Sequence, residues 1–148
     1  ISGGKKPIKA AYDNEQYYNK ESINNIILAD KNYDTKYILS ILNSNLINWY
    51  YATKFTNAST LTVNVSKAYL SLLPIKILSL EKQQSLIQLV DKMLSLNKHL
   101  NEIQDKQTDE KTRLEKEIQK TDYEINQDVY KLYGITKEEQ KIIEESLR

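Results

Sequence analysis

The sequence lacks cysteine altogether and contains only one histidine among its 148 residues. Without cysteine, the chain has no disulfide framework, no thiol nucleophile and no cysteine-based zinc site. The one histidine, His99, has no second histidine or cysteine with which to share a metal, and it is the sole imidazole that could activate a serine. We therefore predict no catalytic residue and no metal site in this chain, which is not expected to be an enzyme alone.

Glycine and proline are scarce, with three and two residues, which excludes collagen-like and low-complexity chains. No glycine-rich phosphate loop is present, because "SGG" precedes lysines and a proline without a strand before it or a helix after it. No apolar run approaches the roughly 18 residues that span a bilayer, and the N-terminus has no signal-peptide pattern. We therefore expect a soluble, cytoplasmic protein with no membrane partner.

Charge is unevenly distributed, although the net charge is only +1. Residues 1–80 contain nine lysines and five acidic residues, whereas residues 81–148 contain twelve lysines or arginines and fifteen acidic residues. Eight of the eleven tyrosines also lie in the first half. Because lysines neutralise phosphates and tyrosines can stack or donate hydrogen bonds, this composition suits DNA or RNA, and we expect any anionic partner to prefer the first half.

Two short segments of the first half have strand patterns. The run around "INNIIL" is partly β-branched and bounded by polar residues, which predicts a strand near residues 23–29. Apolar and polar residues alternate over residues 61–65, which predicts a second, half-buried strand.

Helical spacing separates these two segments. Apolar residues recur at intervals of three and four after Asp34, a capping residue, and predict a helix of about residues 35–53. Ser66 can cap a short helical turn that ends before Pro74, and the run from Pro74 onward should be extended.

The second half is helical throughout. Its apolar seam has the spacing of a coiled coil and comprises Leu86, Leu89, Met93, Leu96, Leu100 and Ile103. Residues 104–113 interrupt the seam, and a turn between antiparallel helices is favoured there over one continuous helix. Gly134 is expected to end the second helix, and Thr136 with Glu139 to open a last short helix as a capping box.

These patterns together predict an α+β protein. A small mixed α/β part occupies residues 1–80, and a long, coiled-coil-like helical hairpin with a short C-terminal helix occupies residues 81–148. Candidate DNA contacts are chosen because they are positively charged, are tyrosines flanked by polar residues, or lie in a loop. They are Lys5, Lys6, Lys9, Tyr17, Tyr18, Lys20, Lys54, Thr56, Asn57, Ser59, Thr60 and Lys67. For Trp49 and Tyr50, on the apolar face of the predicted helix, packing in the core is favoured over base stacking.

Several segments in order resemble one family. They are "YDTKYILSILNSNLINWYY", "AYLSLLPIKI", "LIQLVDKMLSLNKHL" and "EIQKTDYEINQDVYKLYGITKEEQKIIE". Over about residues 17–146 the chain resembles the TaqI-like C-terminal specificity domain of type IIG restriction-modification enzymes and related DNA adenine methyltransferases. The last segment is the most specific, and its matching residues are Thr121, Asp122, Ile125, Val129, Tyr130, Leu132, Tyr133, Gly134 and Thr136. Asn126 and Asp128 depart from the family pattern, which usually has aspartate and leucine there.

The resemblance implies a division of labour. An upstream domain would bind S-adenosylmethionine and methylate adenine through an Asn-Pro-Pro-Tyr type motif. In some members this domain lies behind a nuclease domain that uses Mg. The C-terminal domain would recognise the target sequence in double-stranded DNA. Neither motif is present here, and the first residue is Ile1, so we expect an excised recognition piece of a longer protein with no cofactor of its own. Residues 81–148 would dock the recognition part on the methyltransferase domain.

Two alternatives stay open. One is half of a type I specificity subunit, whose recognition domains also end in "LP" and a long helix that joins separate modification subunits. The other is a helical protein-interaction module without DNA binding, in which the positive charge of the first half is incidental.

Overall fold

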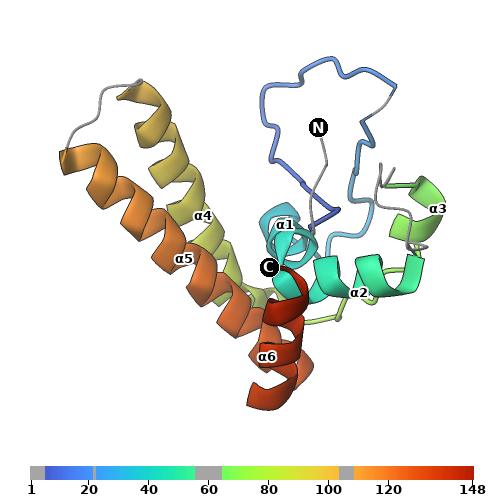
Figure 1. The fold of residues 1–148 in the computed structure, drawn as a ribbon. Helices are drawn as coiled ribbons and strands as arrows, with labels where there is room; N and C mark the ends of the chain where they lie inside the picture. The colour runs from blue at the N-terminus through green and yellow to red at the C-terminus, as the bar shows by residue number, and fades with distance from the viewer. Residues whose placement is uncertain (1–5, 22, 56–64, 104–108) are drawn as a thin grey trace.

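The computed structural model describes residues 6–21, 23–55, 65–103 and 109–148. The helices within these residues are α1 (Thr35–Asn43), α2 (Asn45–Phe55), α3 (Lys67–Leu70), α4 (Leu80–Glu102), α5 (Asp109–Tyr133) and α6 (Lys137–Ser146). Helices make up 64% of the described residues, and none of these residues forms a strand. The predicted α+β class, with its mixed α/β part, is therefore wrong: the described chain is helical with extended connections (Figure 1).

The segment 23–29 forms no strand, contrary to the prediction, and no strand pairs with it among the described residues. Its hydrogen bond to a distant part of the chain runs from the Asn24 side-chain amide to the Val65 carbonyl, at 2.7 Å. Ile27 is 90% exposed. An apolar, β-branched run becomes a strand only when a second backbone pairs with it. Of the second predicted strand, residues 61–65, only Val65 lies within the described residues.

The helix predicted over residues 35–53 is in fact two helices that meet at Ser44. Ser44 has extended backbone angles, φ −63° and ψ 152°, and so ends α1. Its hydroxyl donates to the Ile41 carbonyl at 2.7 Å and accepts from the Ile47 amide at 3.2 Å. One serine side chain therefore satisfies a backbone group on each side of the break.

The Asn48 side chain stabilises the break between α1 and α2 by hydrogen bonds. Its side-chain amide donates to the Leu42 and Ser44 carbonyls at 3.2 and 3.0 Å, and its oxygen accepts from the Ile8 amide at 2.8 Å. The side chain is completely buried. The last of these bonds ties down an N-terminal strap, residues 6–10, which crosses the junction of α1 and α2.

A second asparagine completes the attachment of the strap. The Asn43 oxygen accepts from the Ala10 amide at 2.9 Å, and its amide donates to the Ala10 carbonyl at the same distance. The Asn43 side chain thus pairs with both the N–H and the C=O of one strap residue, as a neighbouring strand would.

The remaining helix boundaries follow the predicted caps. Asp34 caps α1 and Ser66 caps α3, each by accepting a hydrogen bond from an amide of the first turn. Gly134 has a φ of +70° where α5 ends, a left-handed conformation that suits glycine. Thr136 and Glu139 form the predicted capping box at the start of α6.

Helices α4 and α5 form a hairpin arm, in which they lie side by side along their whole length (Figure 1). The chain therefore reverses between Ile103 and Asp109, as predicted, with residues 104–108 outside the described residues. The helices α1, α2 and α3 are called the body, and next to it the arm packs through buried side chains on α4, including Leu86 and Val90. Farther out, Leu96, Leu100 and Ile103 of the α4 seam are half-buried.

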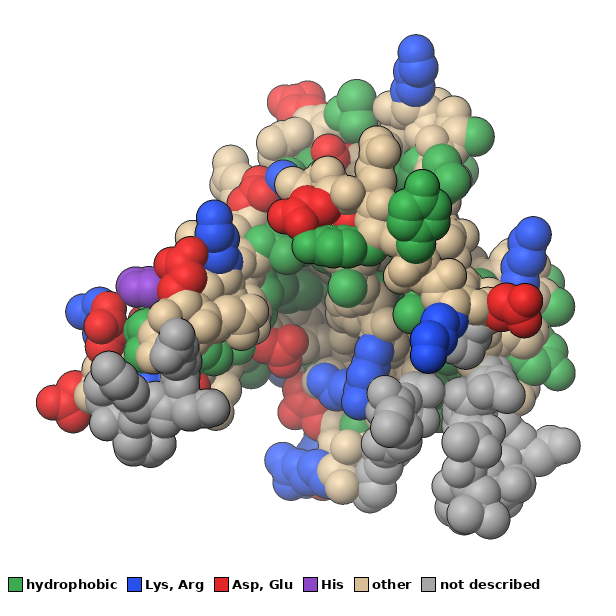
Figure 2. All heavy atoms as spheres, turned by 90° about the horizontal axis from the view of Figure 1, so that it is seen from above, with side chains coloured by type: hydrophobic (Ala, Val, Ile, Leu, Met, Phe, Trp, Pro, Cys, Tyr) green, Lys and Arg blue, Asp and Glu red, His purple; other side chains and the backbone are tan. Residues whose placement is uncertain are grey.

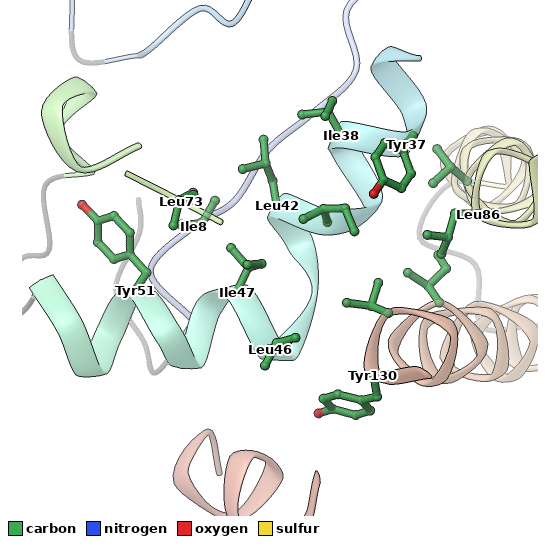
Figure 3. Close-up of a cluster of buried hydrophobic side chains, with 14 of the residues drawn as sticks. Ile8, Tyr37, Ile38, Leu42, Leu46, Ile47, Tyr51, Leu73, Leu86 and Tyr130 are labelled. Atoms are coloured by element: carbon green, nitrogen blue, oxygen red, sulfur yellow. The ribbon is translucent and has the colours of Figure 1, made fainter. Parts of the chain in front are cut away.

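A single hydrophobic cluster joins the body and the arm (Figure 3). Its members come from the strap, α1, α2, the residue 73 region, α4, α5 and α6, and among them are Ile8, Tyr37, Ile47, Leu73, Leu86, Val129 and Ile143. The division into parts at residues 80 and 81 stays a prediction, but packing crosses that boundary. Gln83, which the sequence analysis did not single out, crosses it as well: its completely buried side chain accepts from the Asp34 amide at 2.9 Å and donates to the Asn32 carbonyl at 2.6 Å.

Replacement of Asn48 tests how much the fold depends on the break. We expect Asn48→Ala to lower the free energy of unfolding by about 3 kcal/mol, because the buried Ile8 amide and two carbonyls lose a partner. Urea unfolding followed by circular dichroism measures it. The matched control is Asn97→Ala on the exposed face of α4, where the expected change is within about 0.5 kcal/mol. Equal losses for the two variants would contradict this role of Asn48.

Candidate nucleic-acid interface

Some of the predicted DNA contacts lie outside the described residues, and the others lie in two exposed groups and in the strap. Lys5, Thr56, Asn57, Ser59 and Thr60 lie outside the described residues. Lys9, Tyr17, Tyr18 and Lys20 lie on or beside an exposed segment between the strap and α1, and Lys54 and Lys67 lie at the end of α2 and in α3. Lys6 is half-buried in the strap.

Residues 11–21 form the exposed segment, and every side chain in it is exposed. Asp13 shapes it by accepting hydrogen bonds from the Glu15 and Tyr17 amides at 2.8 and 3.0 Å. The Tyr17 hydroxyl donates to the Glu15 carboxylate, a hydrogen bond that raises the pKa of Tyr17. Tyr18 is fully exposed and makes no hydrogen bond to a described residue. Of this tyrosine pair, Tyr18 is thus the one free to contact a ligand.

The charge around this segment is mixed. Lys9 and Lys20 flank Asp13 and Glu15, and Glu21 follows directly. Figure 2 views the molecule from above, and on this face lysine side chains project singly among carboxylates without forming a continuous basic patch. Attraction to phosphates from this segment is therefore weaker than its two lysines alone suggest.

Two other lysines of the first half are used inside the molecule. Lys36 forms an ion pair of 2.5 Å with Asp91 of α4, which raises the pKa of Lys36, and lies 5.7 Å from the centre of the Tyr12 ring. The Lys76 side chain donates to the Leu132 carbonyl at the end of α5, at 2.7 Å. These cations attach the body to the arm, so the charge balance of the sequence overstates what is available for DNA.

Four aromatic rings form an aromatic cluster, which comprises Tyr50, Tyr51, Phe55 and Tyr69. The Phe55 and Tyr69 rings are stacked, with centroids 4.9 Å apart and planes inclined by 11°. Tyr51 meets both of them edge-on at 5.4 and 6.4 Å. The cluster brings the end of α2 against α3, and with them the neighbourhoods of Lys54 and Lys67. As predicted, Tyr50 packs against the core.

The sequence contains a signal for this region that the analysis above did not use. Residues 35–80 include four lysines and no aspartate or glutamate. Since Lys36 and Lys76 have partners within the molecule, Lys54 and Lys67 are the two cations of this acid-free stretch that remain exposed without an ion pair among the described residues. A run without carboxylates is favourable for an approaching polyanion.

Tyr133, one of the residues matched in the last segment of the sequence, makes hydrogen bonds within the molecule. The Tyr133 hydroxyl donates to the Pro74 carbonyl at 2.7 Å and accepts from the Lys76 amide at 3.1 Å. The Asn126 oxygen accepts from the Asn45 amide at 2.7 Å, and so caps α2 from α5. Asn126, where the family pattern has aspartate, thus joins the arm to the break at Ser44.

Comparison with known families gives one match to a family model. Residues 3–75 match the TaqI-like C-terminal specificity domain. The recognition made from the sequence is therefore confirmed for this region, and a role in DNA recognition within restriction-modification follows from it. The matched specificity-domain region ends before α4, so the assignment of the last segment to the family stays a prediction. No curated protein and no solved structure matched the chain.

The specificity-domain region includes the strap, the exposed segment, α1, α2 and α3. Both groups of described candidate contacts lie inside it. Within the described residues, no three histidine, cysteine, aspartate or glutamate side chains are placed to hold a metal, and no helix is both long and apolar enough to cross a membrane. The single His99 lies on the arm, 3.3 Å from Glu110.

Two completely buried tyrosines beneath the specificity-domain region differ in their hydroxyl groups. The Tyr37 hydroxyl donates to the Lys76 carbonyl at 2.6 Å, whereas the Tyr130 hydroxyl has no hydrogen-bond partner among the described residues. We expect Tyr37→Phe to lower the free energy of unfolding by about 1–2 kcal/mol and Tyr130→Phe to change it by less than about 0.5 kcal/mol. Urea titrations at pH 7 compare them, and a larger loss for Tyr130→Phe would contradict this assignment.

We expect the protein to lose stability at alkaline pH, because Tyr130 and Tyr37 ionise more readily in the unfolded chain. Burial raises the pKa of Tyr130 to about 12, against a smaller opposing effect of Asn45, and raises the pKa of Tyr37 further. The unfolded chain loses these protons near pH 10. The contribution of the two hydroxyls to stability is therefore full below pH 10 and is lost as the pH rises towards 12. Tyr130→Phe should flatten this fall, and an unchanged alkaline slope would contradict it.

Proposed function

We propose that this chain is the C-terminal DNA sequence-recognition part of a type IIG restriction-modification enzyme, a site-specific DNA adenine methyltransferase with or without endonuclease activity. The observation that carries the proposal is the match of residues 3–75 to the specificity domain. The exposed Tyr18 and the exposed lysines of that region support it, because they supply base-contacting and phosphate-contacting groups.

Catalysis belongs, in this proposal, to a methyltransferase domain of the same parent polypeptide. That domain would bind S-adenosylmethionine, and a cleaving parent would also use Mg. The arm and α6 would orient the recognition region on the methyltransferase domain. This role is supported by the packing of α4 and α5 on α1, because a shared core attaches the arm to the specificity-domain region.

Half of a type I specificity subunit is the second candidate. The arm is as consistent with a type I subunit as with a type IIG enzyme, because a helical hairpin of this length could equally join separate modification subunits. Gene context distinguishes the two: a methyltransferase module in the same reading frame supports type IIG, and a separate modification gene supports type I.

Exchange of residues 1–80 between related parents tests DNA recognition directly. Methylated genomic DNA is mapped for its motif before and after the exchange. We expect the methylated motif to change with residues 1–80, because base contacts are assigned to that half. An unchanged motif would exclude sequence recognition by this half, and would favour the helical interaction module.

The chain itself should bind duplex DNA weakly and with strong salt dependence, with a dissociation constant on the order of 10⁻⁴–10⁻⁶ M for non-specific sequences. We expect the double variant Lys9→Gln, Lys20→Gln to weaken binding and to reduce the slope of log K against log salt by about 1 per lysine that contacts phosphate. Fluorescence anisotropy with a labelled duplex measures both quantities.

The matched control replaces two exposed lysines of the arm, Lys98→Gln and Lys116→Gln. It makes the same change in net charge outside the matched region, and should leave the slope unchanged. Equal effects of the two double variants would show that binding follows total charge, and would contradict a DNA-contacting first half.

A further inference from the structure

The aromatic cluster is the main attachment of α3 to the rest of the molecule. None of the four residues of α3 is fully buried, although Leu70 is half-buried against the core. The Tyr69 ring is stacked on Phe55, and the completely buried Tyr51 lies against both rings. The Tyr51 hydroxyl also accepts a hydrogen bond of 3.3 Å from the Ser66 amide. The position of α3 is thus determined by rings supplied by α2.

Each partner of the stack carries a lysine close by in the chain. Lys54 directly precedes Phe55, and Lys67 lies two residues before Tyr69 in the same short helix. Both lysines are exposed, and neither forms an ion pair with a described residue. They also lie in the stretch from residue 35 to residue 80 that has no carboxylate. Each of the two stacked rings thus has an exposed lysine close to it in the chain, and the two lysines lie on the separate helices that the stack joins.

We propose that the stack of Phe55 and Tyr69 positions Lys54 and Lys67 as a pair of phosphate contacts for DNA. The inference rests on the proposed function, and names a part of the interface that residue type alone does not identify. Lysine is a point charge on a flexible stem, so its contribution to a DNA interface depends on where the backbone holds that stem. Tyr69 and Phe55 are positioning residues in this arrangement, and the lysines touch the DNA.

The alternative role for Tyr69 is direct contact with DNA through its exposed ring, which is 41% accessible. The two roles predict different effects on the salt dependence of DNA binding. A ring that touches DNA adds an uncharged contact, so its loss weakens binding and leaves the salt dependence unchanged. A ring that positions lysines changes the salt dependence when it is removed, although no charge has been altered.

The test measures the affinity of the 148-residue chain for a labelled DNA duplex at several salt concentrations. The double variant Lys54→Gln, Lys67→Gln should lower the slope of log K against log salt by about 2, one for each phosphate contact. Tyr69→Ala should lower it by about 1 or more with both lysines intact. Tyr69→Phe keeps the ring and should retain the original slope.

Two controls separate positioning from loss of structure. Tyr123→Ala removes another exposed tyrosine, on α5, and should change nothing. Phe55→Leu keeps an apolar side chain but removes the stack, and should reproduce the effect of Tyr69→Ala. Circular dichroism of each variant confirms that the helices are retained.

The outcomes are distinct. A normal salt slope for Tyr69→Ala and Phe55→Leu, with weaker binding, would overturn positioning in favour of direct contact by the rings. A normal slope for the lysine double variant would overturn the phosphate contacts, while binding through Lys9 and Lys20 could still support the proposed function. Absence of any DNA binding by the unaltered chain at low salt would overturn the proposed function and this inference with it.

Discussion

The structure depends on one buried amide, the side chain of Asn48. Its three hydrogen bonds end α1, support the turn into α2 and hold the strap across the junction. A completely buried polar group with every bond satisfied fixes one geometry, because any other arrangement leaves donors or acceptors unpaired. The direction of α2 follows from this, and so does the place where Asn126 of α5 can cap it. The body, the strap and the arm are thus connected within a few residues of one break.

The sequence predicted correctly those helices for which the apolar spacing and the capping residues indicate the same segment. α4, α5 and α6 have long stripes and clear ends, and these local signals need no knowledge of the rest of the fold. The break at Ser44 could not be predicted in this way, since the apolar stripe continues through it and the decisive contacts come from Ile8, 40 residues away from Asn48. The strand predicted near residues 23–29 failed for a related reason: a β-branched run suits a sheet, but pairing requires a second backbone that the local pattern does not contain.

The candidate interface was only partly accessible from composition. Counting lysines singled out residues 1–80, and the match to the specificity domain lies within that half. The count could not show that Lys36 and Lys76 are engaged with Asp91 and Leu132. Pairing of charges is a property of the folded surface, so a better guide within the sequence is the absence of opposite charge. That criterion points to residues 35–80, and hence to Lys54 and Lys67.

The arm has a surface that constrains how a partner domain can meet it. The apolar row of α4 that faces the core ends at Leu94, and the next positions on that row are Asn97, Lys98 and Asn101, all exposed. The Lys92–Glu117 ion pair joins α4 to α5. This row of α4 therefore presents polar side chains to a third helix. A partner domain that contacts it would do so through polar and charged side chains, which fix orientation more than they add affinity. Such an interface suits a spacer that sets the distance and angle between the specificity-domain region and a partner, while the tight packing of the arm remains where α1 and α2 meet it.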